Sequence, residues 1–277
     1  KISELELFLK KFLEFHKQNS DAFLLSADIK FLQKKNDSAA IYLRKSLAIN
    51  PVPFEVWSQL MTTELAENNY LSVIKDAENA IINHPNQPLS YIIIGVAQSS
   101  IKNYNDALQN LKTGVSLVVD DSLLTSDFEH HIGDAYYQLE DFENAFIHLN
   151  KAINYNPNNP VLLNNYSYYL SEQKKDLALA EKLILKALKF YPNNPTFLDT
   201  YGWVLFTKED YANAEIWLNK AVSNSTEENG VILEHYGDVL FLLDKKEEAI
   251  IFWEKAQKLE GVSDKIQSKI NEKKFIK

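Results

Sequence analysis

Small side chains recur along this chain at intervals of 34 to 38 residues, each set among large apolar ones. Ala145, Ala180 and Ala214 follow one another at intervals of 35 and 34 residues, and Gly95 and Gly133 lie 38 residues apart. A fixed period of roughly 20 to 50 residues is typical of solenoids, in which one supersecondary unit stacks on the next. This spacing constrains the fold more than any single motif does.

One pair of predicted helices shows what a repeat contains. Amphipathic helices are predicted over 196–207 and 211–222, joined by a three-residue turn. Gly202 removes a side chain from the first helix where it must lie close to the second, and Ala214 and Ala221 do so from the other side. Large residues on both helices fill the remaining space. Each repeat is therefore predicted to be a helical hairpin.

Seven full repeats are predicted on this register. Residues 1–19 have the pattern of the second helix of a truncated repeat, so we expect the protein to continue N-terminally; a self-contained N-terminal cap is the alternative. The isoleucines near the other end predict a capping helix over 263–277, and the extra length near Asp120 predicts an extended loop. The predicted repeats span 20–53, 54–87, 88–125, 126–159, 160–194, 195–229 and 230–262.

These residues resemble the tetratricopeptide repeat, whose pattern is large, large-small, large in the first helix and small, large, small-Pro in the second. The match covers essentially the whole chain and is strongest from Ser126 to Leu259. The resemblance implies an all-α fold, a right-handed α-solenoid whose first helices line a concave groove while the second helices form a convex back. One repeat departs from the pattern, because Gly114 replaces its second small alanine and no proline ends it.

Two segments and one tryptophan resemble a particular group within this family. DTYGWVLF at 199–206, EHYGDVLF at 234–241 and a closing Trp253 are similar to bacterial multi-repeat proteins, some of which are envelope lipoproteins. This similarity implies a bacterial protein in the periplasm or attached to the outer membrane, with the cytoplasm left open.

Composition excludes several classes of function. The chain has 38 acidic and 29 basic residues, a formal charge of −9, so we expect no nucleic-acid partner. It has no cysteine, which excludes disulfides and thiol chemistry. The longest apolar run, 91–97, is too short to span a membrane. No catalytic or phosphate-binding motif occurs, and we expect neither enzymatic activity nor a cofactor.

The predicted groove has two parts. The first helices before residue 100 offer mainly apolar side chains, which either bind a partner or pack against neighbouring helices. Those after residue 126 offer aromatic, amide and acidic side chains, which suit an extended peptide with apolar anchors and basic residues; the alternative is that these side chains are merely solvated. The predicted partner-binding residues are His130, His131, Asp134, Tyr137, Asn164, Asn165, Tyr168, Asp199, Thr200, Trp203, Glu234, His235, Asp238 and Phe241.

A histidine and an aspartate recur three residues apart, at His131 and Asp134 and again at His235 and Asp238. This spacing allows a hydrogen bond or half of a metal site. Structural repetition explains the duplication, so no metal is assigned. We expect a non-enzymatic scaffold or adaptor for protein–protein interaction. The alternatives are a substrate-presenting region of a larger enzyme and a self-associating component of an envelope assembly, and the oligomeric state stays open.

Overall fold

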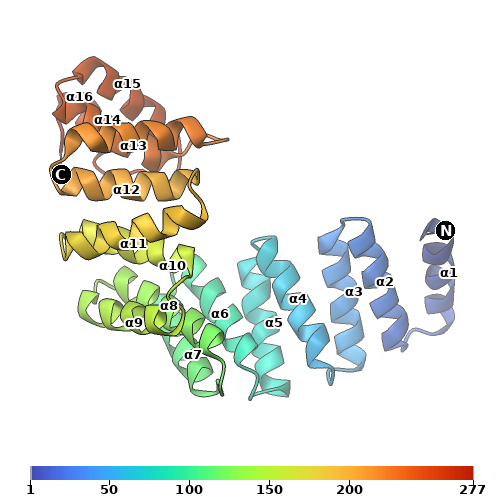
Figure 1. Cartoon of the computed structure of the whole chain (residues 1–277). Helices are drawn as coiled ribbons and strands as arrows, with labels where there is room; N and C mark the ends of the chain where they lie inside the picture. Colours follow the sequence, from blue (N-terminus) through green and yellow to red (C-terminus); the bar gives the residue numbers. More distant parts are fainter. Residues whose placement is uncertain (1, 277) are drawn as a thin grey trace. The chain divides into compact units, whose positions relative to one another are not determined.

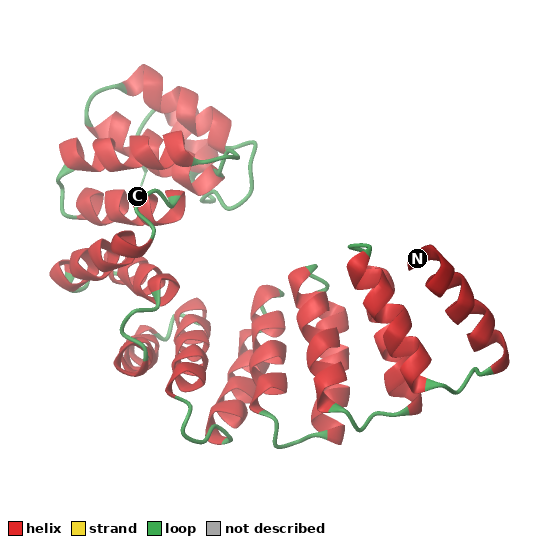
Figure 2. Cartoon of the chain, turned by 45° about the vertical axis from the view of Figure 1, so that its right-hand side comes forward, coloured by secondary structure: helices red, strands yellow, loops and turns green. Residues whose placement is uncertain are grey.

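The computed structural model describes residues 2–276, and all of their regular secondary structure is helical (Figure 2). The predicted all-α fold is therefore confirmed. The chain divides into two compact units, one up to Tyr155 and the other from Asn156 onward. In each unit consecutive helices lie side by side as helical hairpins, so each is an α-solenoid (Figure 1).

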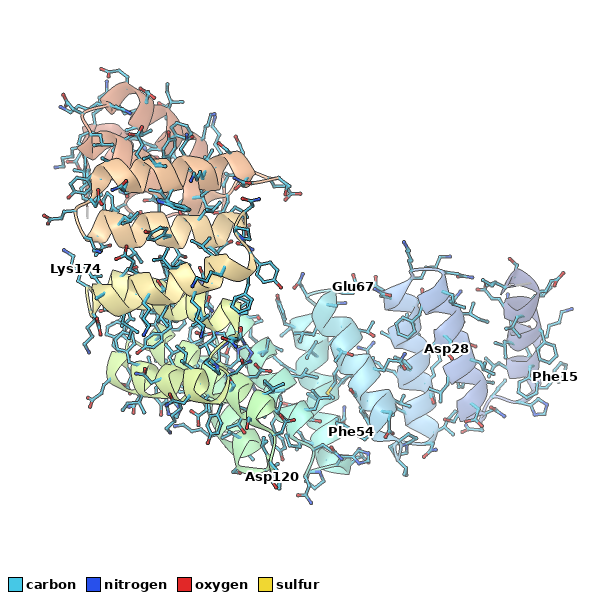
Figure 3. All side chains as sticks on the ribbon, viewed as in Figure 1. Phe15, Asp28, Phe54, Glu67, Asp120 and Lys174 are labelled. Carbon is cyan, nitrogen blue, oxygen red and sulfur yellow. The ribbon has the colours of Figure 1, made fainter. Side chains whose placement is uncertain are left out.

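The first unit holds the helices α1 to α9. Each first helix packs on the second helix of its own hairpin, and each hairpin packs on the next. The last residue of α1, Phe15, is largely exposed (Figure 3). The helices are α1 (Ile2–Phe15), α2 (Ser20–Leu32), α3 (Asn36–Ile49), α4 (Phe54–Ala66), α5 (Tyr70–Asn83), α6 (Pro88–Ser100), α7 (Tyr104–Ser116), α8 (Ser122–Gln138) and α9 (Phe142–Tyr155).

The second unit holds the helices α10 to α16. The first helix α12 also contacts the first helices α10 and α14 on either side of it, so the three lie in a row on one face of the unit. The helices are α10 (Pro160–Glu172), α11 (Leu177–Phe190), α12 (Pro195–Thr207), α13 (Tyr211–Asn224), α14 (Gly230–Leu242), α15 (Lys246–Ala256) and α16 (Ile266–Glu272).

Glycine lets the two helices of a hairpin approach each other closely. A Cβ atom on Gly202 would lie 2.6 Å from Leu218 Cγ, and one on Gly133 would lie 2.7 Å from Leu149 Cγ. Both distances are far below van der Waals contact, so no larger residue fits without movement. The close approach predicted from the sequence at Gly202 is confirmed.

The departure at Gly114 has a physical reason. A Cβ atom at this position would lie 2.5 Å from both the Phe128 ring and the Cβ of Tyr91. Phe128 is fully buried in the first unit, so its ring occupies the space that the usual alanine methyl would need.

Every hairpin turn between a first and a second helix has the same backbone conformation. At one such turn, Glu209 has a φ of +64°, and the N–H of Asp210 bonds to the Leu205 carbonyl at 3.0 Å. This is a Schellman motif, in which a left-handed residue ends the helix and satisfies its last carbonyls. The left-handed residues are Lys34, Asn68, Lys102, Glu140, Lys174, Glu209 and Asp244.

Two sequence-based expectations about segments are wrong. The extra length near Asp120 does not form an extended loop, because Asp121 caps α8 and lengthens it to 17 residues. The capping helix does not span 263–277 but only Ile266–Glu272, because Lys273 turns left-handed with a φ of +49°. Ile266 is nevertheless buried against Trp253 and Ala256, so the short α16 covers apolar surface of the preceding hairpin.

Candidate functional site

A cavity of about 540 Å³ lies in the second unit and is bounded by the first helices and the segment after α15. Tyr168, Trp203, Glu234, His235 and Asp238 are the predicted partner-binding residues that line it. The lining also includes the aromatic residues Phe206, Tyr211 and Phe275, the charged residues Glu172, Lys174, Glu209, Lys265 and Lys269, and Ser171, Thr207, Val231, Leu242, Gly261, Ser263 and Ile276.

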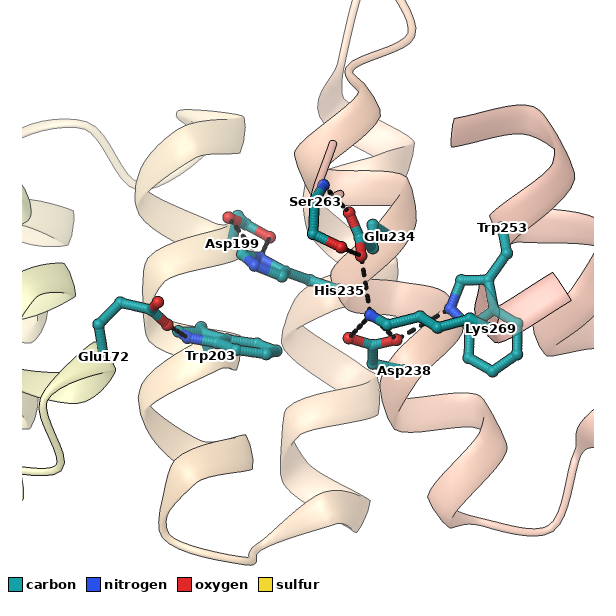
Figure 4. Close-up of polar contacts among 9 residues, drawn as sticks. All are labelled: Glu172, Asp199, Trp203, Glu234, His235, Asp238, Trp253, Ser263 and Lys269. Carbon is teal, nitrogen blue, oxygen red and sulfur yellow. Dashed lines mark hydrogen bonds and ion pairs between the residues drawn. The ribbon is translucent and has the colours of Figure 1, made fainter. Parts of the chain in front are cut away.

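Trp203 connects three first helices at the cavity. Its indole stacks on the imidazole of His235 in α14, with centroids 3.9 Å apart, and on the ring of Phe206, 4.6 Å away. Its Nε1–H donates to Glu172 in α10 (Figure 4). The indole is therefore held by contacts on α10, α12 and α14, and it presents a rigid aromatic group to the cavity.

Lys269, from α16, is buried between two carboxylates of α14. Its Nζ lies 2.8 Å from Glu234 Oε1 and 2.7 Å from each carboxylate oxygen of Asp238 (Figure 4). Only 5% of the lysine side chain is exposed. Ser263 donates from its backbone N–H and its hydroxyl to Glu234, and Trp253 Nε1 donates to Asp238 at 2.9 Å. The two predicted ligand-binding carboxylates thus already hold a lysine of the same chain.

His235 forms an ion pair with Asp199 of α12. Its Nδ1 lies 3.0 Å from one carboxylate oxygen and 3.1 Å from the other. Burial alone would lower the pKa of His235, but Asp199, together with the charges of Asp238 and Glu172, outweighs burial and raises it. The protonated form of His235 is therefore more favoured than in a free imidazole, and Asp199 fixes the ring beside Trp203.

The pKa values of the two carboxylates of α14 are shifted in opposite directions. Burial raises the pKa of Asp238 to about 6, against the lowering effect of Lys269 and His235. Burial also acts to raise the pKa of Glu234, but its hydrogen bonds from Lys269 and Ser263 prevail and lower it. Glu234 and Asp238 in the lining and Asp199 behind His235 are three carboxylates that face two cationic groups, Lys269 and His235, so this cluster is electronegative when all are ionised.

The remaining predicted residues of the second unit lie elsewhere. Asn164 and Asn165 line a second cavity of about 430 Å³ between the starts of α10 and α12. Thr200 is buried, and Phe241 stacks on the Trp253 ring with centroids 5.4 Å apart. Asp199 supports His235 and does not line the larger cavity.

Four predicted residues lie in α8 of the first unit. The imidazoles of His130 and His131 stack with centroids 5.4 Å apart, and His130 Nε2 lies 3.3 Å from Asp134. Burial lowers the pKa of each histidine to about 4, and for His131 the neighbouring His130 adds to this effect. Tyr137 packs against Phe142 at 5.2 Å. These residues belong to the first unit and are not part of the 540 Å³ cavity.

The apolar part of the predicted groove is mostly core. Ile92 and Ile93 are buried in the hydrophobic core of the first unit, and Leu24, Phe31, Leu89 and Val96 pack against it. Packing between neighbouring helices, which was the alternative considered for these residues, accounts for Ile92 and Ile93.

Sequence reasoning missed the residues that complete the cavity, chiefly Lys269, Glu172, Phe206 and Phe275. Lys269 follows Ile266 by three residues and so lies on the same helical face as that buried isoleucine. This is the signal that could have marked it as a buried lysine. Glu172 carries no comparable signal, because it lies at the end of α10 on a polar stretch.

The part of the chain that the structure describes contains neither a candidate metal site nor a candidate membrane-spanning helix. Within residues 2–276, no group of three or more His, Asp or Glu side chains is placed to hold a metal ion. Over the same range, none of the helices is both long enough and apolar enough to cross a bilayer.

Comparisons with known proteins agree with the fold of helical hairpins. The tetratricopeptide repeat family matches residues 130–159, and no curated protein sequence matches the chain. A tetratricopeptide repeat protein from Parabacteroides merdae is similar in structure, with a TM-score of 0.71 at 13% identity over 92% of this chain and 98% of that one. The APC/C hetero-tetramer Cut9-Hcn1 gives 0.67 at 16%, over 97% and 52%.

A third solved structure is YrrB, described as a TPR protein with an unusual peptide-binding site. Its TM-score is 0.51 at 15% identity, over 69% of this chain and 95% of YrrB. Together with the recurring hairpins, glycine contacts and Schellman turns, these matches show that residues 130–159 form a tetratricopeptide repeat and that the chain has the fold of multi-repeat tetratricopeptide repeat proteins.

Proposed function

We propose that this protein is a non-enzymatic scaffold that binds an extended segment of a partner protein, and that the second unit binds it at the 540 Å³ cavity. Proteins with this fold commonly hold partner proteins, and YrrB, a structural neighbour, is described as having a peptide-binding site. The proposal assigns no catalytic step to any residue of the cavity.

The observation that carries the proposal is the lining of the cavity. Trp203, Tyr168 and Tyr211 provide aromatic surface. The hydroxyls of Ser171 and Thr207 donate to backbone carbonyls of their own helices, and their oxygens can still accept from a peptide N–H. Such linings suit a peptide, because aromatic groups give contact area at low entropic cost and hydroxyls pair with its backbone.

The charges favour a basic partner. Glu172 and Glu209 line the cavity together with Glu234 and Asp238, and a fifth carboxylate, Asp199, lies behind His235. A lysine or arginine on the partner would therefore gain favourable electrostatic interactions, and it would be attracted more strongly at low ionic strength. Three lysines, Lys174, Lys265 and Lys269, also line the cavity, so the excess of negative charge is small.

A phage-displayed library of random linear peptides tests the proposal. We expect the intact chain to select peptides with an aromatic or aliphatic residue next to a basic one. Trp203→Ala should weaken the binding of a selected peptide at least about 30-fold, or about 2 kcal/mol, as for a buried aromatic anchor. Isothermal titration calorimetry measures this change.

Trp217→Ala is the matched control. Trp217 lies on α13, where it packs against Tyr201 and under Lys220, and it does not line the cavity. Its substitution should leave the affinity for the selected peptide unchanged. Equal affinities of Trp203→Ala, Tyr168→Ala and the unsubstituted chain, at unchanged helical circular dichroism, would show that peptides bind elsewhere.

A further inference from the structure

The 261–276 segment, which includes α16, occupies one side of the cavity. Gly261, Ser263, Lys269, Phe275 and Ile276 all line it. The ring of Phe275 meets the ring of Phe206 edge to face at 5.8 Å, close to the stack of Phe206 on Trp203. The segment therefore places a cationic group and an aromatic group against the surface that we propose for the partner.

The contacts of Lys269 are those of an ammonium ligand in a fitted site. Its Nζ has three oxygen neighbours on Glu234 and Asp238, all within 2.8 Å. Ser263 adds two hydrogen bonds to Glu234. If Lys269 left, two nearly fully buried carboxylates would lose their cation, which is costly unless another cation replaces it.

The segment itself is small. Its helix α16 has seven residues, of which only Ile266 and Lys269 are buried. Residues in the left-handed region, Gly261 with a φ of +82° and Lys273 with +49°, lie on either side of the helix. A helix of this length is not stable alone, so its position depends on these few side-chain contacts. Local opening is expected first in segments with so few buried contacts.

We infer that the 261–276 segment is an intramolecular occupant of the cavity, displaced by a partner segment that presents a lysine to Glu234 and Asp238 and an aromatic residue near Phe206. This inference rests on the proposed function and adds the chemistry of the partner. A cation is required to restore the charge balance of the buried carboxylates, and a lysine fits because its ammonium group matches the site that Nζ of Lys269 fills. The aromatic residue replaces the contact that Phe275 makes with Phe206.

A labelled synthetic peptide of residues 263–276 tests the inference. Fluorescence anisotropy measures its binding to the intact chain and to the full-length variant Lys269→Met, which holds its own segment less tightly. We expect the peptide to bind the variant at least about tenfold more tightly than the unsubstituted chain. Lys258→Met, which removes an exposed lysine that does not line the cavity, should bind like the unsubstituted chain. A peptide carrying Lys269→Met should bind none of them.

Two outcomes would overturn the inference: equal affinity for the unsubstituted chain and the Lys269→Met variant, or no binding to either. The segment would then be a fixed wall of the cavity. If library-selected peptides still bound the unsubstituted chain and lost affinity with Trp203→Ala, the proposed function would stand without this inference.

A second variant and a second measurement guard against misfolding of Lys269→Met. Phe275→Ala keeps the buried cation and removes only the contact with Phe206, so we expect a smaller gain in peptide affinity. Hydrogen exchange of α16 in the unsubstituted chain should become faster when a library-selected peptide is added. Slower exchange in α16 would contradict displacement, because it would mean that the peptide binds on top of the segment.

Discussion

Two copies of one motif, His-x-Gly-Asp, occupy matching positions in α8 and α14 but have different chemical environments. In α8, His131 stacks on His130, and burial lowers its pKa to about 4. In α14, His235 is also enclosed by the fold but pairs with Asp199, which raises its pKa. The difference comes from neighbouring helices and not from the motif.

The preceding first helix explains part of this difference. Asp199 lies three residues before Gly202, and the matching position before Gly95 is Ile92, a buried core residue. A first helix with isoleucine at this position offers no charge to the next histidine. The α14 copy also gains Lys269 as a partner for Asp238, whereas Asp134 in α8 pairs with His130.

The largest expected effect comes from removing the cation that only the α14 copy has. Lys269→Met should lower the free energy of unfolding by about 3–5 kcal/mol, because it leaves Glu234 and Asp238 buried without their partner. Urea denaturation followed by circular dichroism measures the loss. Arg44→Met is the control: Arg44 also bridges two buried carboxylates, Glu64 and Asp76, but is partly exposed, so its loss should cost less. Equal losses would mean that burial of the cation is unimportant.

The next largest effect should come from lowering the pH, because the two copies of the motif should change stability in opposite directions. In α8 the folded pKa of His130 and of His131 is about 4, below the unfolded value of 6.5. The unfolded chain therefore binds protons first as the pH falls, and stability is lost between 6.5 and 4. By about pH 5.5 the expected loss is about 1–3 kcal/mol for the pair.

In α14 the effect of pH on stability has the opposite sign. The folded pKa of Asp238 is about 6, above its unfolded value of 3.8, and that of His235 is raised as well. The folded state binds these protons first, so their contribution is present at low pH and is lost as the pH rises through the folded values. Protection factors from hydrogen exchange at about pH 7 and about pH 5.5 should fall in α8 and not in α14. A fall of equal size in both helices would contradict this account.

Replacing the glycine of each motif by alanine should lower stability by different amounts, and this difference should be smaller than the effects above. A Cβ on Gly237 would lie 2.6 Å from Trp253, whose ring is fully buried and held by Asp238. A Cβ on Gly133 would meet the flexible end of Leu149. We expect Gly237→Ala to cost roughly 2–3 kcal/mol and Gly133→Ala about 1 kcal/mol, in thermal unfolding. Equal costs would show that Trp253 can move as freely as Leu149.

Asp199→Asn should have the smallest effect on stability, but it should change the pKa of His235. Without the ion pair, burial dominates, and the pKa of His235 should fall below 6.5, toward the behaviour of His131. An NMR titration of the imidazole protons measures both histidines in one sample. His131 should not change, and an unchanged His235 would show that Asp199 does not set its pKa.

The hairpin fold could be predicted from the sequence because its determinants are local and periodic. Gly202 and Ala214 mark helix contacts by their size alone, and Asn-Pro pairs such as Asn194 and Pro195 mark helix starts, where the asparagine side chain caps the helix. The lengthened α8 and the shortened α16 were not predicted. Both depend on single residues, a cap at Asp121 and a left-handed Lys273, that carry no periodic signal.

The candidate site was only partly predictable. Helical periodicity indicated that Tyr168, Trp203 and His235 share one face, and all three line the cavity. The periodicity could not show that Glu234 and Asp238 already bind Lys269, because that contact joins residues 31 to 35 positions apart through a loop. Charge balance at the cavity is a tertiary property, and a list of acidic residues does not determine it.

Hydrogen exchange of the intact chain, with and without a library-selected peptide, tests the central claim most directly. The account predicts slower exchange on the cavity side of the second unit, in α12 around Trp203 and in α14 around His235. Protection confined to the second helices α11 and α13, or to the first unit, would contradict the assignment of the cavity as the partner-binding site.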